Sequence, residues 1–410
     1  MVCAATLAAV MVLIGSMAPG PIRVRDDFES GSLGAWRVED DTTLVFSPRL
    51  EADQEQVNSA QTWFYGQLSN VLNREVRIRI EGLTHTVYNG QRGNVLAFER
   101  NTVPVFSYDG AVWERFTDCG FDKGTRTFRI RHIFSRDTVW IAYLPPYTCS
   151  RLESLIGDVR KHPSVSVESI GRSVQQRELY LLTVSEPGNQ PEERPVVWIV
   201  ARQHAFEAGG TWAAEGLLRF LTGSEPEAQA IRSKVTFKLC PMLNPDGVAR
   251  GGTRFNARGV DLNRHWHEDD PLSRDQVSAP EIALLKQSIL RWCTNHRLDL
   301  WINLHNNDMV WNEDGDYVRF APSGRTDDAR RLESILRGET IYTGPFEPAP
   351  NAQATEAVVA SRTGALSLLM EMKTGYLEGA QRWTGTDVFL AHGRGLARAV
   401  SKFFDRGRVF

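Results

Sequence analysis

The chain has 410 residues, which is enough for two or three domains with full hydrophobic cores and excludes a peptide hormone or a small disulfide-stapled protein. Hydrophobic residues make up 42% and charged residues 24%, and 47 Lys and Arg against 50 Asp and Glu give a formal net charge of −3. This is an ordinary globular composition, and it has no excess of positive charge that would favour binding to nucleic acid or to an acidic membrane.

The five cysteines, at positions 3, 119, 149, 240 and 293, form no Cys-x-x-Cys pair. A zinc site built from neighbouring thiolates is therefore excluded, and any metal must be held by His and carboxylate side chains. If the protein is exported and residues 1–18 are removed, four cysteines remain and three disulfide pairings are open.

Residues 2–18 carry no charge, are mostly apolar and end in the small-residue pattern Ser16-Met17-Ala18. This predicts a signal peptide over residues 1–18 and export to the periplasm or the medium. The segment is short for a membrane span, so we expect no stable span in the mature chain. The basic start of a signal is missing, which leaves two alternatives: a misplaced start codon or a buried N-terminal segment. Without a signal the chain would be cytoplasmic.

The sequence pattern of the first third of the chain predicts short strands. The segment 42–46 is apolar, and 76–80 and 126–132 alternate apolar with basic residues, which predicts half-buried antiparallel strands. Turn sequences at 89–90 and 109–110 separate such runs. We predict an all-β sandwich-like domain over residues 23–146.

The pattern changes at Pro145-Pro146, where Thr148 is a plausible N-cap for an amphipathic helix that continues to residue 160. Strands and helices then alternate. The expected strands are 196–200, 235–239, 298–304 and 365–370, and the expected helices are 211–221, 279–294, 327–337 and 386–404. This alternation predicts an α/β domain with a mixed sheet over residues 147–408.

Two of these strands end at possible metal ligands. His204 and Glu207 follow the strand at 196–200, and His305 follows the strand at 298–304. Two histidines and a glutamate are a zinc-binding set that leaves one position open for water. A surface ion pair between His204 and Glu207, or a purely structural His305, is the alternative interpretation.

A carboxylate follows the third apolar strand, because Glu371 comes directly after 365–370. Burial there would raise its pKa toward that of a general base. A salt bridge with Lys373 is the alternative.

Between the first two strand ends lie the turn Asn244-Pro245-Asp246-Gly247, then Arg254, and then Asp261-Leu262-Asn263-Arg264. The pair His204 and Glu207 comes before these motifs, and His305 and Glu371 come after them. Taken in this order, the motifs resemble those of the zinc carboxypeptidase family. The resemblance implies a mixed-sheet zinc carboxypeptidase-like catalytic domain and a metallopeptidase activity.

The resemblance also implies a role for each matching residue. His204, Glu207 and His305 would bind one Zn²⁺ per chain, and Glu371 would take a proton from the attacking water. Arg254 would stabilise the oxyanion, Asn263 and Arg264 would bind the terminal carboxylate of the substrate, and Asp261 would orient the first zinc histidine. Tyr342 is a candidate for the mobile tyrosine that covers the substrate.

A rival metal pair is offered by His265 and His267. We favour packing for this segment, because Trp266 alternates with the two histidines and the family places an aromatic or amide residue there.

Within the family, the segments 61–65, 88–90 and 146–152 and the spacing of nine between Arg254 and Asn263 resemble the cytosolic carboxypeptidase-like subgroup, which carries a β-domain before the catalytic domain. The resemblance covers about residues 24–405. The sequence departs from it at Ala205-Phe206, which stand where Pro-Gly is usual, in the polar residues after His305, and in the signal-like segment.

The resemblance implies hydrolysis of C-terminal residues from peptides or proteins. An amidohydrolase acting on side-chain-linked amides, such as γ-glutamyl or cell-wall peptide bonds, and a non-catalytic zinc-bearing binding module are the alternatives. The subgroup often removes acidic residues through a basic pocket, but residues 351–357 contain no Lys or Arg and only Arg362 is nearby. The oligomeric state is not predicted.

Overall fold

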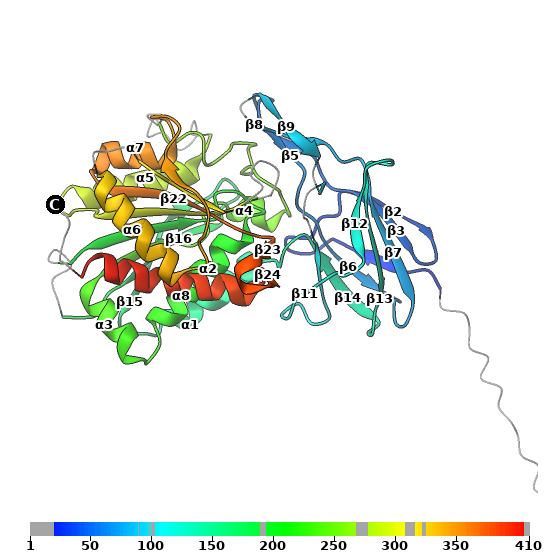
Figure 1. The fold of residues 1–410 in the computed structure, drawn as a ribbon, viewed down its shortest axis with the longest axis horizontal. Coiled ribbons are helices and arrows are strands. Elements are labelled where there is room, and N and C mark those ends of the chain that lie inside the picture. The colour runs from blue at the N-terminus through cyan, green and yellow to red at the C-terminus, as the bar shows by residue number, and fades with distance from the viewer. Residues whose placement is uncertain are drawn as a thin grey trace, which may run out of the picture.

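The computed structural model describes residues 20–88, 90–96, 98–99, 103–188, 194–267, 278–307, 316–321 and 325–405. The chain forms a β-rich part followed by an α/β part, which lie side by side (Figure 1). This is the fold class that the sequence predicts. The predicted signal peptide lies outside the described residues, and the domain limits of 23–146 and 147–408 stay a prediction.

The β-rich part contains three sheets. Its strands are β1 (Arg23–Arg25), β2 (Ala35–Asp40), β3 (Thr43–Ser47), β4 (Glu51–Ala52), β5 (Ser59–Ala60), β6 (Tyr65–Ser69), β7 (Glu75–Ile80), β8 (His85–Tyr88), β9 (Gln91–Leu96), β10 (Val105–Ser107), β11 (Glu114–Arg115), β12 (Cys119–Asp122), β13 (Thr127–Ile133) and β14 (Thr138–Ala142). Two five-stranded sheets, β1-β6-β14-β10-β11 and β12-β13-β7-β3-β2, pack their apolar faces into one core, and β4-β5-β8-β9 forms a smaller sheet.

The expected alternation in this part is confirmed. β7 and β13 pair antiparallel, with Ile78 opposite Ile130 and Arg79 opposite Arg129. The isoleucines are buried in the core, and the arginines face outward to acidic partners. β7 and β13 therefore each bury one face, as an alternation with a period of two residues requires.

The α/β part is built on an eight-stranded sheet. Its strands, in the order β15-β16-β18-β17-β19-β22-β20-β21, are β15 (Val165–Arg172), β16 (Glu178–Val184), β18 (Thr236–Cys240), β17 (Val196–Ala201), β19 (Leu300–Asn306), β22 (Leu366–Met372), β20 (Tyr317–Phe320) and β21 (Phe346–Pro348). The four central strands, β18, β17, β19 and β22, run parallel, so their carboxyl ends meet at one edge of the sheet. A two-stranded ribbon of β23 (Tyr376–Leu377) and β24 (Arg382–Trp383) follows, with a short 3₁₀ turn at Glu378–Ala380.

Helices cover both faces of this sheet (Figure 1). One face packs against α1 (Cys149–Val159), α2 (Ala208–Leu221), α3 (Pro226–Lys234), α6 (Thr326–Glu339) and α8 (Thr386–Phe403), and the other packs against α5 (Pro280–Cys293) and α7 (Thr355–Thr363). A short helix, α4 (Pro245–Ala249), follows β18. None of the described helices is long and apolar enough to pass through a bilayer.

Individual residues determine where two of these helices begin. Thr148 caps α1, with its hydroxyl accepting a hydrogen bond from the backbone N–H of Arg151 at 3.2 Å, as predicted. Helix α2 begins at Ala208, three residues before the expected start, directly after Glu207. Gly209 and Gly210 permit this early start because they approach β19 closely: a Cβ at Gly210 would lie 3.0 Å from the carbonyl oxygen of Leu304.

Candidate metal centre and catalytic cleft

The loop after β17 positions the first two candidate ligands. Arg202, buried and with φ of 61°, turns the chain out of the strand, and its Nε donates to the carbonyl oxygen of Ala205 at 2.7 Å. Phe206 donates its backbone N–H to the carbonyl oxygen of Thr253 and packs into the core of the β-rich part. His204 and Glu207 are thereby fixed between the strand and α2.

The third candidate ligand comes from the neighbouring parallel strand. His305 lies inside the end of β19 rather than after it, opposite Glu371 of β22. Because parallel strands end at the same edge, β17, β19 and β22 deliver their polar side chains to one place, which is where open α/β sheets form sites.

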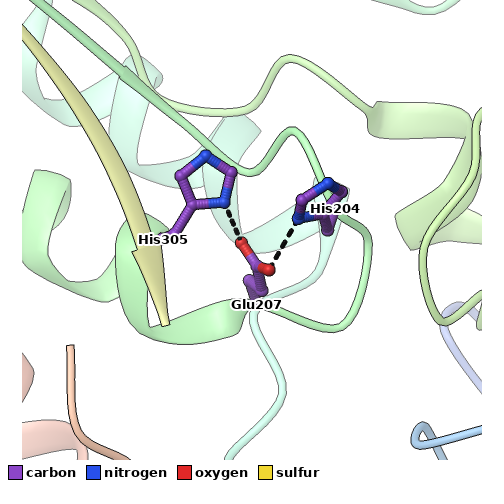
Figure 2. A group of neighbouring side chains, drawn as sticks. All are labelled: His204, Glu207 and His305. Atoms are coloured by element: carbon purple, nitrogen blue, oxygen red, sulfur yellow. Dashed lines mark hydrogen bonds and ion pairs between the residues drawn. The ribbon is translucent and has the colours of Figure 1, made fainter. Parts of the chain in front are cut away.

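His204, Glu207 and His305 converge there (Figure 2). Nδ1 of His204 lies 2.6 Å from Oε1 of Glu207, and Nδ1 of His305 lies 2.6 Å from Oε2 of the same carboxylate. One potential ligand atom from each residue lies within 4.8 Å of the others, and the three residues are 0–3% exposed. A surface ion pair between His204 and Glu207 does not describe this buried arrangement.

The hydrogen bonds fit a divalent metal. Nε2 of His204 lies 3.1 Å from Oδ1 of Asp261, and a proton donated there leaves Nδ1 as the free ligand atom. Nε2 of His305 has no hydrogen-bond partner among the described residues. Two imidazole nitrogens and one carboxylate from facing segments are the donor set of a His₂Glu zinc site.

The electrostatics of Glu207 and His305 favour the protonation states that a metal site needs. Burial alone would raise the pKa of Glu207, but the two imidazoles outweigh it and lower the pKa, so the carboxylate is ionised. Burial lowers the pKa of His305, which keeps its imidazole neutral at pH 7. Ionised carboxylate and neutral imidazole are the forms that bind metal.

Asp261 joins this group to Arg254. Its Oδ2 accepts from Nε of Arg254 at 2.7 Å, while its Oδ1 faces His204. Burial would raise the pKa of Asp261, but Arg254 and then His204 outweigh it and hold the pKa well below its usual range. The same carboxylate raises the pKa of Arg254 despite burial, so the guanidinium stays charged.

Asn263 and Arg264 lie on the same loop. Oδ1 of Asn263 accepts from the Thr355 hydroxyl at 2.5 Å and from Nδ2 of Asn303 at 3.3 Å, which orients the amide. Nη1 of Arg264 donates to the carbonyl oxygen of Asn263 at 3.0 Å.

A cleft of about 350 Å³ gathers these side chains. It is lined by Tyr88, Gln91, His204, Phe206, Glu207, Arg254, Asn263, Arg264, Asn306, Asn307, Tyr317, Arg319, Leu369 and Glu371. Glu371 is half-buried, and its Oε1 lies 3.5 Å from the hydroxyl oxygen of Tyr317. Lys373 forms a salt bridge with Glu378 at 2.9 Å. Of the sequence-predicted site residues, the cleft is lined by His204, Glu207, Arg254, Asn263, Arg264 and Glu371. His305 and Asp261 are buried and contact lining residues without lining the cleft themselves, and Tyr342 lies elsewhere.

Tyr342 does not reach the cleft. Its side chain is 3% exposed in the core of the α/β part, with its ring 6.4 Å from that of Phe346 and 4.8 Å from the guanidinium of Arg337. Apolar packing, not the substrate path, determines its position.

The rival histidine pair is separated by Trp266, which is buried and donates its indole N–H to Oε1 of Gln203 at 2.9 Å. His267 is exposed, and His265 lines a neighbouring pocket. Within the described part of the chain, the single group of three or more His, Cys, Asp and Glu residues placed to bind a metal is that of His204, Glu207 and His305.

The cleft residues that the sequence did not predict include Tyr88, Gln91, Tyr317 and Arg319. Tyr317 and Arg319 lie on β20, a strand with the alternating sequence Tyr-Val-Arg-Phe, which was the available signal. Tyr88 and Gln91 belong to the β8–β9 hairpin, about 115 residues before His204, and no local pattern ties them to the site.

Comparison with known proteins gives two family matches and several relatives. Residues 152–379 match the family described as zinc carboxypeptidase, and residues 24–144 match that described as cytosolic carboxypeptidase N-terminal domain. Cytosolic carboxypeptidase 6 of Mus musculus is 28% identical over 300 residues, which cover 70% of this chain and 53% of that protein. The Homo sapiens protein of the same name is 35% identical over 182 residues, covering 43% and 35%. The chain thus spans about half, or less, of the length of these relatives.

Solved structures share the fold. A metallo-carboxypeptidase from Burkholderia cenocepacia superposes with a TM-score of 0.78 at 24% identity, covering 94% of this chain and 99% of that one. A metallo-carboxypeptidase from Pseudomonas aeruginosa, in complex with (2-guanidinoethylmercapto)succinic acid, gives 0.73 at 24% identity, covering 93% and 99%.

The predicted export is wrong. The first part of the chain is of the cytosolic carboxypeptidase type, and the relatives carry the same name, which points to the cytoplasm rather than the periplasm or the medium. The apolar residues 2–18 resemble a signal in composition alone, without the basic start that a signal needs.

Proposed function

Since the chain belongs to the zinc carboxypeptidase family, we propose that it is a metallocarboxypeptidase that removes C-terminal residues from peptides or proteins. The observation that carries this proposal is a cleft lined by Glu371, Arg254, the pair Asn263 and Arg264, and two residues of the His₂Glu group, His204 and Glu207, with the third, His305, in contact with Glu207. This cleft combines a metal-binding set with a proton acceptor and groups suited to a carbonyl and a carboxylate.

The family implies zinc, and we assign one ion per chain to His204, Glu207 and His305. When bound, zinc lowers the pKa of water and polarises a carbonyl, which supplies the nucleophile and part of the electrophilic activation. The protein contributes the three ligands, and it contributes Asp261, which orients His204.

Glu371 is the proton carrier in this scheme. Its carboxylate takes a proton from the attacking water as the new oxygen–carbon bond forms at the last peptide carbonyl. It returns that proton to the amide nitrogen as the carbon–nitrogen bond breaks, and the second proton of the water then passes from the new carboxylic acid to the amine, so the products are a carboxylate and an ammonium group. This role is supported by the register of β22 on β19, in which Glu371 pairs with His305.

Arg254 stabilises the oxyanion that develops on the scissile carbonyl, an interaction worth several kcal/mol, about 3, in a site that excludes water. Asn263 and Arg264 bind the terminal carboxylate, for which a planar guanidinium is suited. That anchor makes the enzyme an exopeptidase. A peptide with a C-terminal amide should therefore be a poor substrate, and retained activity on it would favour the amidohydrolase alternative.

We further propose that acidic C-terminal residues are preferred. The pocket beside the anchor is lined by Asn263, Arg264, Arg319, Thr355 and Glu356 among others. Asp53 and Glu55 also line this pocket, and Glu356 is 1% exposed with its pKa raised by burial. The proposed preference therefore rests on Arg319, which is half-buried beside Arg264, and not on the net charge of the pocket. Arg319 supplies the cation that residues 351–357 lack.

The function is tested by Glu371→Gln. We expect kcat for a C-terminal peptide substrate to fall by at least about a thousandfold, because the proton acceptor is lost. Zinc content, measured by metal analysis of the reconstituted protein, should stay at one ion per chain. A variant with full kcat would contradict the role of Glu371, and wild-type protein that binds no zinc would contradict the metal site.

The substrate preference is tested by Arg319→Gln with matched peptides ending in Glu or Leu. The ratio of kcat/KM for Glu over Leu should fall about tenfold, while kcat/KM for the Leu peptide stays within about twofold. Arg362→Gln, in α7 and outside the cleft, is the control and should leave the ratio unchanged. An unchanged ratio in Arg319→Gln would remove this residue from substrate selection.

A further inference from the structure

The loop that carries Arg254 is held by the β-rich part of the chain. Glu51 of β4 is buried, and its Oε2 accepts hydrogen bonds from the backbone N–H groups of Thr253 and Arg254, both at 2.9 Å. The Thr253 hydroxyl in turn accepts from the backbone N–H groups of Thr62 and Trp63, at 3.3 and 3.2 Å. The backbone at Arg254 is therefore fixed from outside the α/β part.

The side chain of Arg254 is held from two sides. On one side, Nε donates to Oδ2 of Asp261 at 2.7 Å. On the other, the ring of Tyr88, the last residue of β8, lies 4.4 Å from the guanidinium carbon, and Nη1 lies 3.3 Å from the Tyr88 hydroxyl. Nε and Nη1 are thus both in contact with protein groups, and we assign Nη2 to a substrate carbonyl.

Tyr88 also lines the cleft itself, with Gln91 from the other strand of the hairpin. An aromatic face over a guanidinium is an attractive cation–π arrangement, and it prevents the planar group from rotating about its long, flexible side chain. Asp261 alone fixes one nitrogen, whereas Asp261 and Tyr88 together fix the plane.

We propose that Tyr88, from the β-rich domain, is a positioning residue for Arg254, so that the catalytic arginine is held jointly by both parts of the chain. This inference rests on the proposed function. In this proposal the β-rich domain contributes to stabilising the transition state. Without Tyr88, the Arg254 guanidinium keeps its charge and its hydrogen bond to Asp261 but loses the orientation in which Nη2 meets the developing oxyanion. Small misplacements of such groups have large effects on rate.

The test is the kinetics of Tyr88→Phe and Tyr88→Leu. Phe keeps the ring and loses the hydroxyl, so kcat should fall about two- to fivefold. Leu loses both contacts, so kcat should fall roughly 10- to 100-fold, while KM stays within about twofold because the terminal carboxylate is bound by other residues. Zinc content and Tm should match those of the wild type within error.

A double-mutant comparison distinguishes a positioning role of Tyr88 from a general structural role. Tyr88→Leu introduced into Arg254→Ala should cause almost no further loss, because the residue through which Tyr88 acts is gone. Tyr108→Leu is the matched control: it removes a tyrosine stacked on Arg136, at 5.6 Å, in the same domain but outside the cleft, and kcat should be unchanged.

The inference is overturned if the losses from Tyr88→Leu and Arg254→Ala multiply, or if Tyr88→Leu changes KM alone. Its failure is distinct from failure of the proposed function. If the wild type cleaves peptides, Arg254→Ala is impaired and Tyr88→Leu is fully active, only the role of Tyr88 is lost. If the zinc-loaded wild type cleaves no peptide at all, the function itself is wrong.

Discussion

At the scale of single residues, Asp261 contacts both a proposed metal ligand, His204, and the proposed oxyanion-binding residue, Arg254. One oxygen faces Nε2 of His204 at 3.1 Å and the other accepts from Arg254 at 2.7 Å. Asp261→Asn keeps the shape but removes the charge, so His204 becomes a weaker ligand and Arg254 loses its ion pair. We expect zinc affinity to fall roughly 10- to 100-fold, measured by competition with a chelator of known affinity.

The control for this variant is Asp246→Asn. Asp246 is equally buried and also pairs with an arginine, Arg177 at 2.7 Å, but it lies outside the cleft. Its substitution should lower stability without changing zinc affinity. Equal zinc affinity in wild type and Asp261→Asn would show that Asp261 does not orient the ligand.

At the scale of elements, the close packing of α2 against α8 depends on two glycines. A Cβ at Gly393 of α8 would lie 1.9 Å from the carbonyl oxygen of Ala213, and a Cβ at Gly216 of α2 would lie 2.1 Å from that of Leu390. Both contacts are to backbone, which cannot move aside without separating the helices. We expect Gly393→Ala to lower the free energy of unfolding by roughly 2 kcal/mol or more, measured by urea denaturation.

Gly157→Ala in α1 tests the same chemical change where there is space. A Cβ at Gly157 meets no atom within 4 Å, so the gain in helix propensity should stabilise the protein by about 0.5–1 kcal/mol. If both substitutions stabilise, the α2–α8 interface has more room than the structure shows.

At the scale of the whole molecule, the two parts contact each other at several places, and residues of both line the cleft. Glu51 binds the loop of Arg254, Phe206 packs into the β-rich core, and Nη2 of Arg115 donates to the carbonyl oxygens of Thr374 and Thr384 at 3.0 and 2.7 Å. These contacts place the site at the junction of the two parts rather than on the α/β part alone.

Global stability should depend on acid through His392 of α8. It is fully buried, and within the described part of the chain neither ring nitrogen has a hydrogen-bond partner. Burial lowers its pKa to about 4 in the folded state, against about 6.5 when unfolded. Between these values the unfolded chain binds more protons, so stability falls as pH drops from about 6.5 to about 4, by on the order of 3 kcal/mol.

His392→Leu should remove this part of the pH dependence. Urea midpoints of the variant and the wild type, measured at pH 7 and pH 4.5 with the same metal content, should differ most at the lower pH. An identical drop in both proteins would assign the acid sensitivity to other groups.

The sequence by itself determined the features that follow from local periodicity and strand ends. Apolar strands are predicted at 196–200, 298–304 and 365–370, and the sequence places His204, Glu207, His305 and Glu371 at or after their ends. The structure pairs these strands in parallel, which brings the four residues to one edge. Alternation predicted the half-buried strands, and Thr148 predicted the start of α1. These are effects of hydrogen bonding and burial within one element or between adjacent strands.

Only the tertiary structure decided which residues complete the cleft. Tyr88 reaches Arg254 from another part of the chain, Arg319 enters the substrate pocket from β20, and Tyr342 packs into the core instead of the cleft. Such contacts depend on how separate elements pack against each other, and side-chain periodicity within an element carries no information about distant partners. The physical reason is that burial fixes the face of each element, whereas packing fixes its neighbours.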